Sequence, residues 1–311
     1  MLHARPLLVP TDFTAGADQA LSQGLQWARR LHLPLHLVHV ASPALPPSYD
    51  PHRHLLDQLA LHDLEGVTVR PVILRRHGVA KALIHHAVRT GAELVVMNVR
   101  GQKWVTPSVP WSHSASVFRQ APCGMLATRE SNPSLLRDGR LGQMLVLLHA
   151  QHEDLSLLHR ALYLARLYRA DLHVLMHAPR TGRSLRSAPF ARNRGVERQA
   201  RMEAQVRRAR TLLHAERLTT PSYLDVTSGD IADDALALAE ERHIDLVVAR
   251  KHESLLDTVL HAETLAAERM IRLAPCPVLV LDPVHESLGF AYSRPRHFSR
   301  PATRIEMPLR N

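Results

Sequence analysis

The chain has 311 residues, of which 45% are hydrophobic and only 4% aromatic, and its formal net charge is +10. This length exceeds one typical α/β domain and fits two domains of about 140 residues with aliphatic cores. No apolar run approaches the roughly 18 residues of a membrane span. Residues 1–13 run straight into a strand pattern and not into a signal peptide, so we expect a cytoplasmic protein.

The first half of the chain alternates short apolar runs with amphipathic segments. Thr14 can cap a helix that follows the first apolar run, because the apolar residues after it recur with a period of 3.6. Further helices are predicted around residues 54–63 and from Gly78 onward. Apolar runs without alternation suit strands that are buried on both faces, which predicts a parallel sheet with helical crossovers. The predicted strands cover residues 7–10, 35–40, 67–74, 94–97 and 123–127.

The second half repeats the first. Residues 144–147 match residues 7–10 at an offset of 137, whereas Gly229 matches Gly78 at an offset of 151. About 14 residues therefore entered the second half between its second and third strands, in an arginine-rich insertion near residues 178–200. A repeat of this size indicates a tandem duplication of whole domains and not a solenoid.

Composition sets the expected domain boundaries. The stretch that contains Asn132-Pro133 and Asp138-Gly139 has no periodicity and is predicted to be a linker. The C-terminal tail holds four prolines and few aliphatic residues, so we expect it to be disordered. The resulting divisions are a first domain at 1–131, a linker at 132–142, a second domain at 143–282 and a basic tail at 283–311.

The positive charge is concentrated in two segments. Residues 178–210 hold ten arginines and two glutamates, a net charge of +8, and residues 283–311 have a net charge of +3. The rest of the chain therefore carries 10 − 8 − 3 = −1. The stretch from Arg180 to Arg210 is either a solvated helix face or a binding surface for an anionic partner. Five of its arginines are expected on a helix whose inner face is formed by Val206, Leu212 and Leu213; these are Arg198, Arg201, Arg207, Arg208 and Arg210.

Cysteine and histidine usage argues against metal chemistry. Cys123 and Cys276 occupy the same position in the two repeats, where each opens an apolar strand, so we interpret both as buried core residues. The sequence has 22 histidines, but no cluster of other ligands stands at metal-ligand spacing around them, and no metal site is expected. It also contains no Ser-His-Asp order, HExxH motif or Walker loop, so no catalytic residue is assigned.

Several short motifs in the same order in both halves carry a family resemblance. They are the segment from Leu8 to Thr14, the strand end at His39-Val40, Gly78 before a helix, and Ala-Pro-Cys before the last strand at Cys123 and again at Cys276. The chain resembles the universal stress protein family over residues 5–128 and 143–282. The resemblance implies an α/β fold of the adenine nucleotide alpha hydrolase type. Two doubly wound parallel sheets would lie in tandem, each with five strands in the order 3-2-1-4-5.

The resemblance also implies where a nucleotide would bind. Family members that bind ATP hold it between strands one and four, with a Gly-x2-Gly-x9-Gly-Ser/Thr loop after strand four. Here that loop begins with Asn98 and has a bulky tryptophan where the family has its third glycine, which should block the cleft or fill it. Turn and cap roles for the matching residues stay open as the alternative. The candidate cleft for ATP or AMP in the first half comprises Asp12, Val40, Asn98, Gly101, Trp111 and Ser112.

The second half departs from this pattern throughout. His149 stands where the first half has Asp12, and the four motif positions are occupied by Arg250, Glu253, Thr264 and Leu265. No ATP site is therefore expected in the second half.

We expect a non-enzymatic stress-response or regulatory protein in which the two halves form a built-in pseudo-dimer through antiparallel pairing of their fifth strands. Such pairing would place Cys123 and Cys276 roughly 15 Å apart, too far for a disulfide. Two alternatives stay open. One is an ATP or AMP binder that uses the first half only and hydrolyses ATP slowly at most. The other is an adaptor for an anionic partner at the arginine-rich segment.

Overall fold

The computed structural model describes residues 5–42, 49–99, 113–130, 132, 141–151, 155–179, 189–216, 218–251, 258–281 and 304–305. In two helices the side chains are described only from residue 196 and from residue 266 onward. The chain divides into two compact units, residues 1–134 together with 284–311, and residues 135–283. The division falls inside the segment predicted to be a linker.

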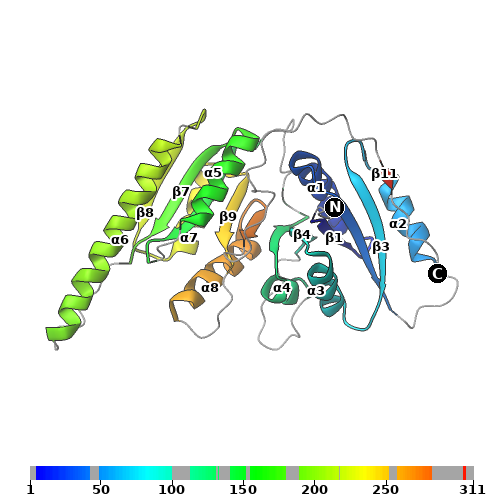
Figure 1. The fold of residues 1–311 in the computed structure, drawn as a ribbon, viewed down its shortest axis with the longest axis horizontal. Helices are drawn as coiled ribbons and strands as arrows, with labels where there is room; N and C mark the ends of the chain where they lie inside the picture. The colour runs from blue at the N-terminus through cyan, green and yellow to red at the C-terminus, as the bar shows by residue number, and fades with distance from the viewer. Residues whose placement is uncertain are drawn as a thin grey trace. The chain divides into compact units, whose positions relative to one another are not determined.

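The first unit is a parallel sheet with the strand order β11-β3-β2-β1-β4-β5. Its five longer strands follow the predicted order 3-2-1-4-5, with a helix in each crossover (Figure 1). The elements are β1 (Leu7–Thr11), α1 (Ala15–Leu31), β2 (Leu35–Ala41), α2 (Pro51–Leu59), β3 (Thr68–Arg75), α3 (Val79–Thr90), β4 (Leu94–Asn98), α4 (His113–Gln120), β5 (Gly124–Thr128) and β11 (Arg304–Ile305).

The second unit repeats this arrangement with the strand order β10-β9-β6-β7-β8. The predicted order 3-2-1-4-5 is therefore present in both halves. The elements are β6 (Gln143–His149), α5 (Ser156–Tyr168), β7 (Asp171–His177), α6 (Pro189–Ala215), β8 (Ser222–Thr227), α7 (Ile231–Glu241), β9 (Leu246–Arg250), α8 (Thr258–Leu273) and β10 (Val278–Leu281).

The sequence did not predict β11. This two-residue strand lies in the C-terminal tail and pairs in parallel with β3, at Thr68 and Val69. An edge strand presents unpaired backbone groups, and a short added strand satisfies some of them. These are the tail residues that the structure describes, so disorder in the remainder of the tail stays a prediction.

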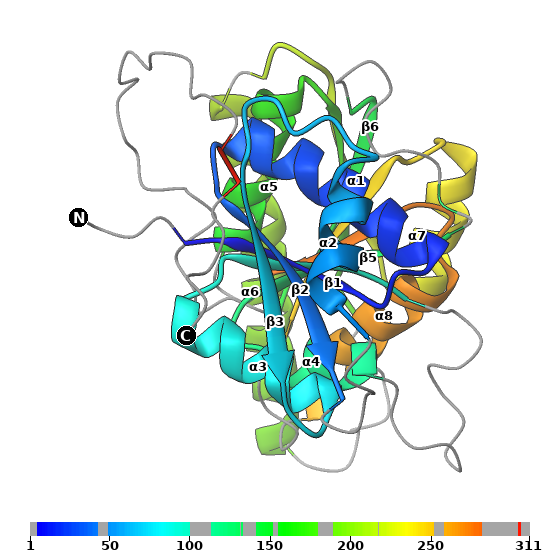
Figure 2. The same ribbon diagram turned by 90° about the vertical axis from the view of Figure 1, so that its right-hand side faces the viewer.

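In the first unit, helices cover both faces of the sheet. In Figure 2, α1 and α2 lie on one side of β1, β2 and β3, and α3 and α4 lie on the other. The α1 helix packs closely, because a Cβ atom on Gly24 would lie 2.6 Å from a methyl group of Val9. The central strands are buried on both faces, as their unbroken apolar runs predicted.

Two helix starts show how local sequence sets the boundaries. Thr14 caps α1 as predicted, since its hydroxyl accepts a hydrogen bond from the N–H of Ala17 at 3.4 Å. The α2 helix was predicted around residues 54–63 but begins earlier, at Pro51. Asp50 caps it through the N–H groups of His52 and Arg53, and proline is favoured at the first position of a helix.

The arginine-rich insertion enters the 27-residue helix α6. Its buried side chains are Met202, Gln205, Ala209 and Leu213. Val206 and Leu212, which were predicted to face inward with Leu213, are only half-buried. The buried stripe is therefore turned by part of a helical turn from the predicted one, because a helix with so many arginines and few large apolar residues gives a weak periodic signal.

Both cysteines are buried, with side chains 1% exposed for Cys123 and 2% for Cys276, and neither forms a disulfide. This agrees with their interpretation as core residues at the start of the last strand of each unit. Across the parts of the chain that the structure describes, no helix has the length and apolar character needed to span a membrane.

Candidate functional site

The candidate site of the first unit lies where the carboxyl ends of β1, β2 and β4 meet. Thr11 pairs with His39, so Asp12 and Val40 follow at adjacent strand ends. Leu8 pairs with Val95, and the same register continued along the strands brings the end of β4 beside the end of β1. Three predicted site residues, Asp12, Val40 and Asn98, are thus brought to one edge of the sheet. This edge is where open α/β sheets bind ligands.

Asp12 occupies the turn between β1 and α1 and is exposed. Its Oδ1 atom accepts hydrogen bonds from the backbone N–H and the hydroxyl of Thr14, at 3.2 and 2.6 Å. The next residue, Phe13, has a left-handed backbone with φ of 63°, which a bulky side chain rarely adopts. The turn therefore fixes the Asp12 carboxylate at the start of α1.

Asn98 ends β4 and packs against the start of α1. A Cβ atom on Gly16 would lie 2.7 Å from the Asn98 side chain, so only glycine leaves room for this contact. The Nδ2 atom of Asn98 is buried and finds no hydrogen-bond partner among the described residues. A buried donor without a partner is costly, which marks this position as one where a ligand or a water molecule is favoured.

Two other strands of this sheet, β2 and β5, also carry a buried polar atom near their carboxyl ends that lacks a hydrogen-bond partner among the described residues. The Nδ1 atom of His39, on β2, lies 3.0 Å from the carbonyl oxygen of Thr11, while its Nε2 atom is buried without a partner in the described chain. The Thr128 hydroxyl, at the end of β5, is also buried and lacks a partner there. The strand ends of the first unit are therefore polar and incompletely satisfied.

The other three predicted site residues lie outside the residues that the structure describes. They are Gly101, Trp111 and Ser112, all in the segment between β4 and α4. Their proximity to Asp12 and Asn98 stays a prediction.

A cluster of rings beside Asp12 was missed by the sequence analysis. The ring of Phe13 lies 4.6 Å from that of His39 and 5.5 Å from that of His54, and Tyr49 lies 5.1 Å from His54. A pocket of about 300 Å³ opens here between α1 and α2, lined partly by Asp18. The rings come from separate elements, so no sequence pattern predicts the cluster, and only Phe13, in the turn after β1, lies next to a predicted site residue.

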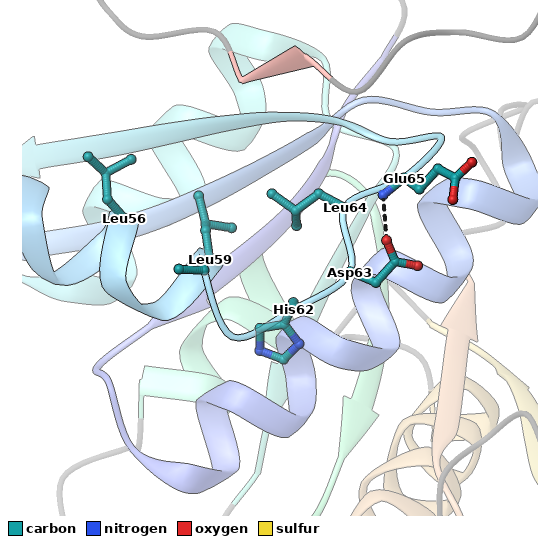
Figure 3. A pocket seen from close by; sticks show the side chains of 7 residues that line it. Leu56, Leu59, His62, Asp63, Leu64 and Glu65 are labelled. Atoms are coloured by element: carbon teal, nitrogen blue, oxygen red, sulfur yellow. Dashed lines mark hydrogen bonds between the residues drawn. The ribbon is translucent and has the colours of Figure 1, made fainter.

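A second, larger hollow of about 610 Å³ lies at the end of α2 (Figure 3). Its apolar lining includes Leu56, Leu59 and Leu64, and the carboxylate of Asp63 accepts a hydrogen bond from the N–H of Glu65 at 2.9 Å. Its lining residues bring no nucleophile next to a base, and we assign no chemistry to it.

The corresponding edge of the second unit has the same backbone hydrogen bond after its fourth strand but different side chains. The N–H of Lys251 donates to Leu281 at 2.7 Å, as that of Val99 donates to Thr128 at 2.7 Å in the first unit. At the position of Asp12, however, His149 packs edge-on against His177, with ring centroids 5.0 Å apart and Nδ1 atoms 3.3 Å apart.

The other positions of the loop motif in the second unit are partly described. Arg250 ends β9, the strand that corresponds to β4. Glu253 lies outside the described residues, and the side chains of Thr264 and Leu265 are not described. The acid of the first unit is therefore replaced by a pair of histidines, and its Asn98 by an arginine.

A charge cluster joins α7 and α8 near this edge. Asp230 caps α7 through the N–H groups of Ala232 and Asp233, and Arg269 donates to both of its carboxylate oxygens at 2.9 and 2.8 Å. Desolvation raises the pKa of Asp230, but the two backbone hydrogen bonds and Arg269 outweigh it, so the net shift is downward. Arg269 also pairs with Asp233. The cluster is a helix cap with a paired counter-charge.

A second pair of histidines lies in the interior of the first unit. His36 on β2 and His86 on α3 approach each other at 3.3 Å. Desolvation foremost lowers the pKa of both rings to about 4, aided by the charges of His86 and Arg70 at His36 and of Arg89, Arg70 and His85 at His86. Among the described residues, no group of three or more His, Cys, Asp or Glu side chains is placed to hold a metal ion.

Comparison with known proteins agrees with this architecture. The family model described as "Universal stress protein family" matches residues 3–129 and 142–282. A solved structure of a functionally unknown protein from Pseudomonas aeruginosa PAO1 is similar at 17% identity and a TM-score of 0.60, and covers 90% of this chain and 93% of its own. A universal stress protein from Archaeoglobus fulgidus DSM 4304 is similar at 16% identity and a TM-score of 0.55, with 90% and 99% covered. The comparison with curated proteins found no match.

Proposed function

Because this chain belongs to the universal stress protein family, we propose that it is a non-enzymatic stress-response protein in which the first unit alone carries an adenine-nucleotide cleft. The observation that carries this proposal is the difference between the two strand edges. The first unit has an exposed Asp12 carboxylate at the same sheet edge as Asn98, whose buried Nδ2 atom has no hydrogen-bond partner among the described residues. The second has the His149–His177 pair and Arg250 at the corresponding places.

The residues of the first edge fit a nucleotide in chemical type. A carboxylate accepts hydrogen bonds from ribose hydroxyls, and the Asn98 amide can donate to a phosphate oxygen or a water molecule. Thr14 holds the Asp12 carboxylate in place, so little side-chain freedom would be lost on binding. The Asp12 side would therefore face the sugar and the loop after β4 would face the phosphates.

Trp111 would regulate access to this cleft. It replaces the glycine that lets backbone approach the phosphates in family members that bind ATP. An indole at this place would occupy the cleft, so the protein would bind ATP or AMP weakly or only after a change in the loop between β4 and α4. This makes a regulatory role more consistent with the sequence than a catalytic one.

Calorimetric titration of the full-length protein with ATP and with AMP tests the proposal. We expect one site per chain at most, lost in Asp12→Ala and retained in the matched variant His149→Ala. Two equivalent sites, or a site that His149→Ala removes and Asp12→Ala does not, would contradict it. If no titration shows heat for any variant, equilibrium dialysis with labelled ATP at millimolar concentration decides whether the first cleft binds at all.

The family architecture also supports a built-in dimer. We propose that β5 and β10, both apolar and both the last strand of their unit, pair antiparallel about a pseudo-two-fold axis. An apolar edge strand is prone to aggregation unless it is paired, which is the physical reason for this arrangement.

A second candidate function is an adaptor for an anionic partner, supported by one specific observation. All five arginines of α6 between residues 198 and 210 are exposed. This candidate is independent of nucleotide binding, because it concerns the second unit.

A further inference from the structure

The charge on α6 differs from the charge on the rest of the described protein. Elsewhere some arginines meet an acid, as Arg29 meets Asp63 and Arg166 meets Glu216. Others, such as Arg70 and Arg76, form no salt bridge among the described residues, but α6 concentrates five arginines of this kind in one helix. Within the described parts of the chain, no salt bridge involves the α6 arginines Arg198, Arg201, Arg207, Arg208 and Arg210. Five like charges within four turns repel one another, so their placement favours an external anion.

Four of the five arginines of α6 form two rows, whereas Arg198 lies one turn before Met202, on the side of the buried stripe. With 3.6 residues per turn, Arg201 and Arg208 lie on one flank of the helix, two turns apart, and Arg207 and Arg210 lie on the other, one turn apart. The outward ridge between the rows has small side chains, Ala200, Ala204 and Thr211, and the buried stripe lies opposite. Two basic rows flanking a low ridge match a groove with an anionic wall on each side.

Each row also holds one acidic residue, Glu197 one turn before Arg201 and Glu203 one turn before Arg207, so the net charge of each row is lower than its arginine count. Glu203 accepts a hydrogen bond from Gln199 at 3.2 Å, and Arg208 donates to Gln205 at 3.2 Å. Glu197 is exposed near the start of the described side chains. Neither glutamate forms a salt bridge with an arginine anywhere in the described chain.

The helix is also accessible. In Figure 1 the N-terminal turns of α6 extend beyond the strands of their own unit. Consistent with this, Val196, Glu197, Arg198, Ala200 and Arg201 are exposed, and Gln199 between them is half-buried. Further along, a hollow of about 560 Å³ between α5 and α6 is lined by Arg207, Arg208 and Thr211, and by His159 from α5.

We propose that α6 docks in the major groove of a nucleic-acid duplex, with its two rows of arginines on the two phosphate strands. The inference rests on the second candidate function and names its partner. A major groove about 12 Å wide admits an α-helix, whose diameter is about 10–12 Å. Residues 198 to 210 span about 18 Å along the helix axis, the length of about five base pairs. Every basic side chain among them is arginine, which binds phosphate in a bidentate manner.

The duplex is favoured over a single strand for a separate reason. Binding of single strands depends on aromatic side chains that stack with the bases. The described side chains of α6 include no aromatic residue. Small residues on the ridge offer few contacts to base edges, so the binding should be insensitive to sequence.

The test measures fluorescence anisotropy of a labelled 20-base-pair duplex of arbitrary sequence with the full-length protein. We expect the logarithm of the affinity to fall with the logarithm of salt concentration with a slope of roughly −3.6, for the four row arginines at −0.9 each. The variant with Arg198, Arg201, Arg207, Arg208 and Arg210 all replaced by Gln should bind about tenfold more weakly or worse at low salt, with the slope reduced by about that amount.

A matched control separates these contacts from net charge. Replacing five exposed arginines of the first unit by Gln, namely Arg30, Arg53, Arg70, Arg76 and Arg89, changes the charge equally and should reduce the slope little. Equal loss in both variants would overturn the proposal. If polyglutamate at equal charge concentration displaces the duplex, or if a single strand binds more strongly than the duplex, the duplex is not the preferred partner. Either result would leave the function as an adaptor for an anionic partner in place. Absence of binding to any polyanion would overturn both, while the calorimetric test of the first unit would be unaffected.

Discussion

The carboxylate of Asp12 accepts two hydrogen bonds from Thr14, from its backbone N–H at 3.2 Å and from its hydroxyl at 2.6 Å. The same Thr14 hydroxyl accepts a hydrogen bond from the N–H of Ala17 and so caps α1. One residue therefore links the start of the helix to the proposed nucleotide cleft. The two roles can be separated by mutation.

Thr14→Ala should lower the free energy of unfolding by about 1 kcal/mol, the usual cost of losing a helix cap, and leave the number of nucleotide sites unchanged. Asp12→Ala should abolish nucleotide binding, because the carboxylate is the group that the cleft requires. Urea unfolding and calorimetry on both variants check this. If nucleotide binding survives in Asp12→Ala but disappears in Thr14→Ala, Asp12 is not the residue that the nucleotide requires.

Trp111→Gly should create or strengthen ATP binding. It replaces an indole by the glycine that lets the loop backbone approach the phosphates in family members that bind ATP. Trp104→Gly is the matched control, since it removes the other tryptophan of the same stretch from a position outside the motif. Titration with ATP compares both with the natural chain. If the natural chain binds ATP in the micromolar range and Trp111→Gly weakens that binding, Trp111 does not fill the cleft.

His36 and His86 should make the first unit sensitive to acid. Burial foremost lowers the pKa of both rings from 6.5 to about 4; the charges of His86 and Arg70 add to this for His36, and those of Arg89, Arg70 and His85 for His86. Between pH 6.5 and about 4 the unfolded chain therefore binds protons at these sites and the folded chain does not. Stability should decrease as the pH falls through this window and stop decreasing, for these groups, below about 4.

Leucine variants check this assignment. His86→Leu should reduce the dependence of the unfolding free energy on pH between 6.5 and 4 to the part due to His36, whereas His85→Leu should change it little, because the charge of His85 is the smallest of the causes that lower the pKa of His86. The two histidines are adjacent on α3, but His85 is exposed and His86 is 3% exposed. A titration by NMR that finds His86 protonated at pH 6 would contradict the prediction.

Asp230 should stabilise the second unit at neutral pH and lose this effect in acid. Its pKa is lowered overall in the folded state, so its stabilising effect is present above the unfolded value of about 3.9 and is lost as the pH falls through the folded value. Asp230→Asn keeps a capping oxygen but removes the charge that faces Arg269, and should cost roughly 0.5–1 kcal/mol at pH 7.

Asp50→Asn is the control for this effect. Asp50 caps α2 by accepting from His52 and Arg53 in the same way that Asp230 accepts from Ala232 and Asp233. Because asparagine and aspartate are similar caps, this variant should change stability little. Urea unfolding at pH 7 and at pH 3 gives the comparison, and equal losses for both variants at pH 7 would remove Arg269 from the explanation.

Cys123 and Cys276 should stay reduced even in oxidising buffer. Antiparallel pairing of β5 with β10 would place them at opposite ends of the paired strands, roughly 15 Å apart, whereas a disulfide requires Cα atoms within about 7 Å. Thiol titration after unfolding, without reductant, should count two thiols per chain. An intramolecular disulfide in monomeric protein would rule out this pairing.

The sequence alone determined most of the architecture. Unbroken apolar runs such as residues 94–97 predicted strands buried on both faces, and their repetition predicted two sheets in tandem, as found. Thr14 predicted the start of α1, because capping depends on residues that are close in sequence. The resemblance placed Asp12, Val40 and Asn98 at one site, and the register of the strands brings them to one edge.

The tertiary structure decided what depends on packing between distant segments. It showed that Gly16 makes room for Asn98, that Phe13 joins a ring cluster with His39 and His54, and that Arg269 pairs with Asp230. It also showed which side of α6 is buried, because a helix rich in arginine carries little periodic information about its inner face. A sequence specifies strands and caps through local chemistry, whereas such contacts exist only after residues tens of positions apart have been brought together.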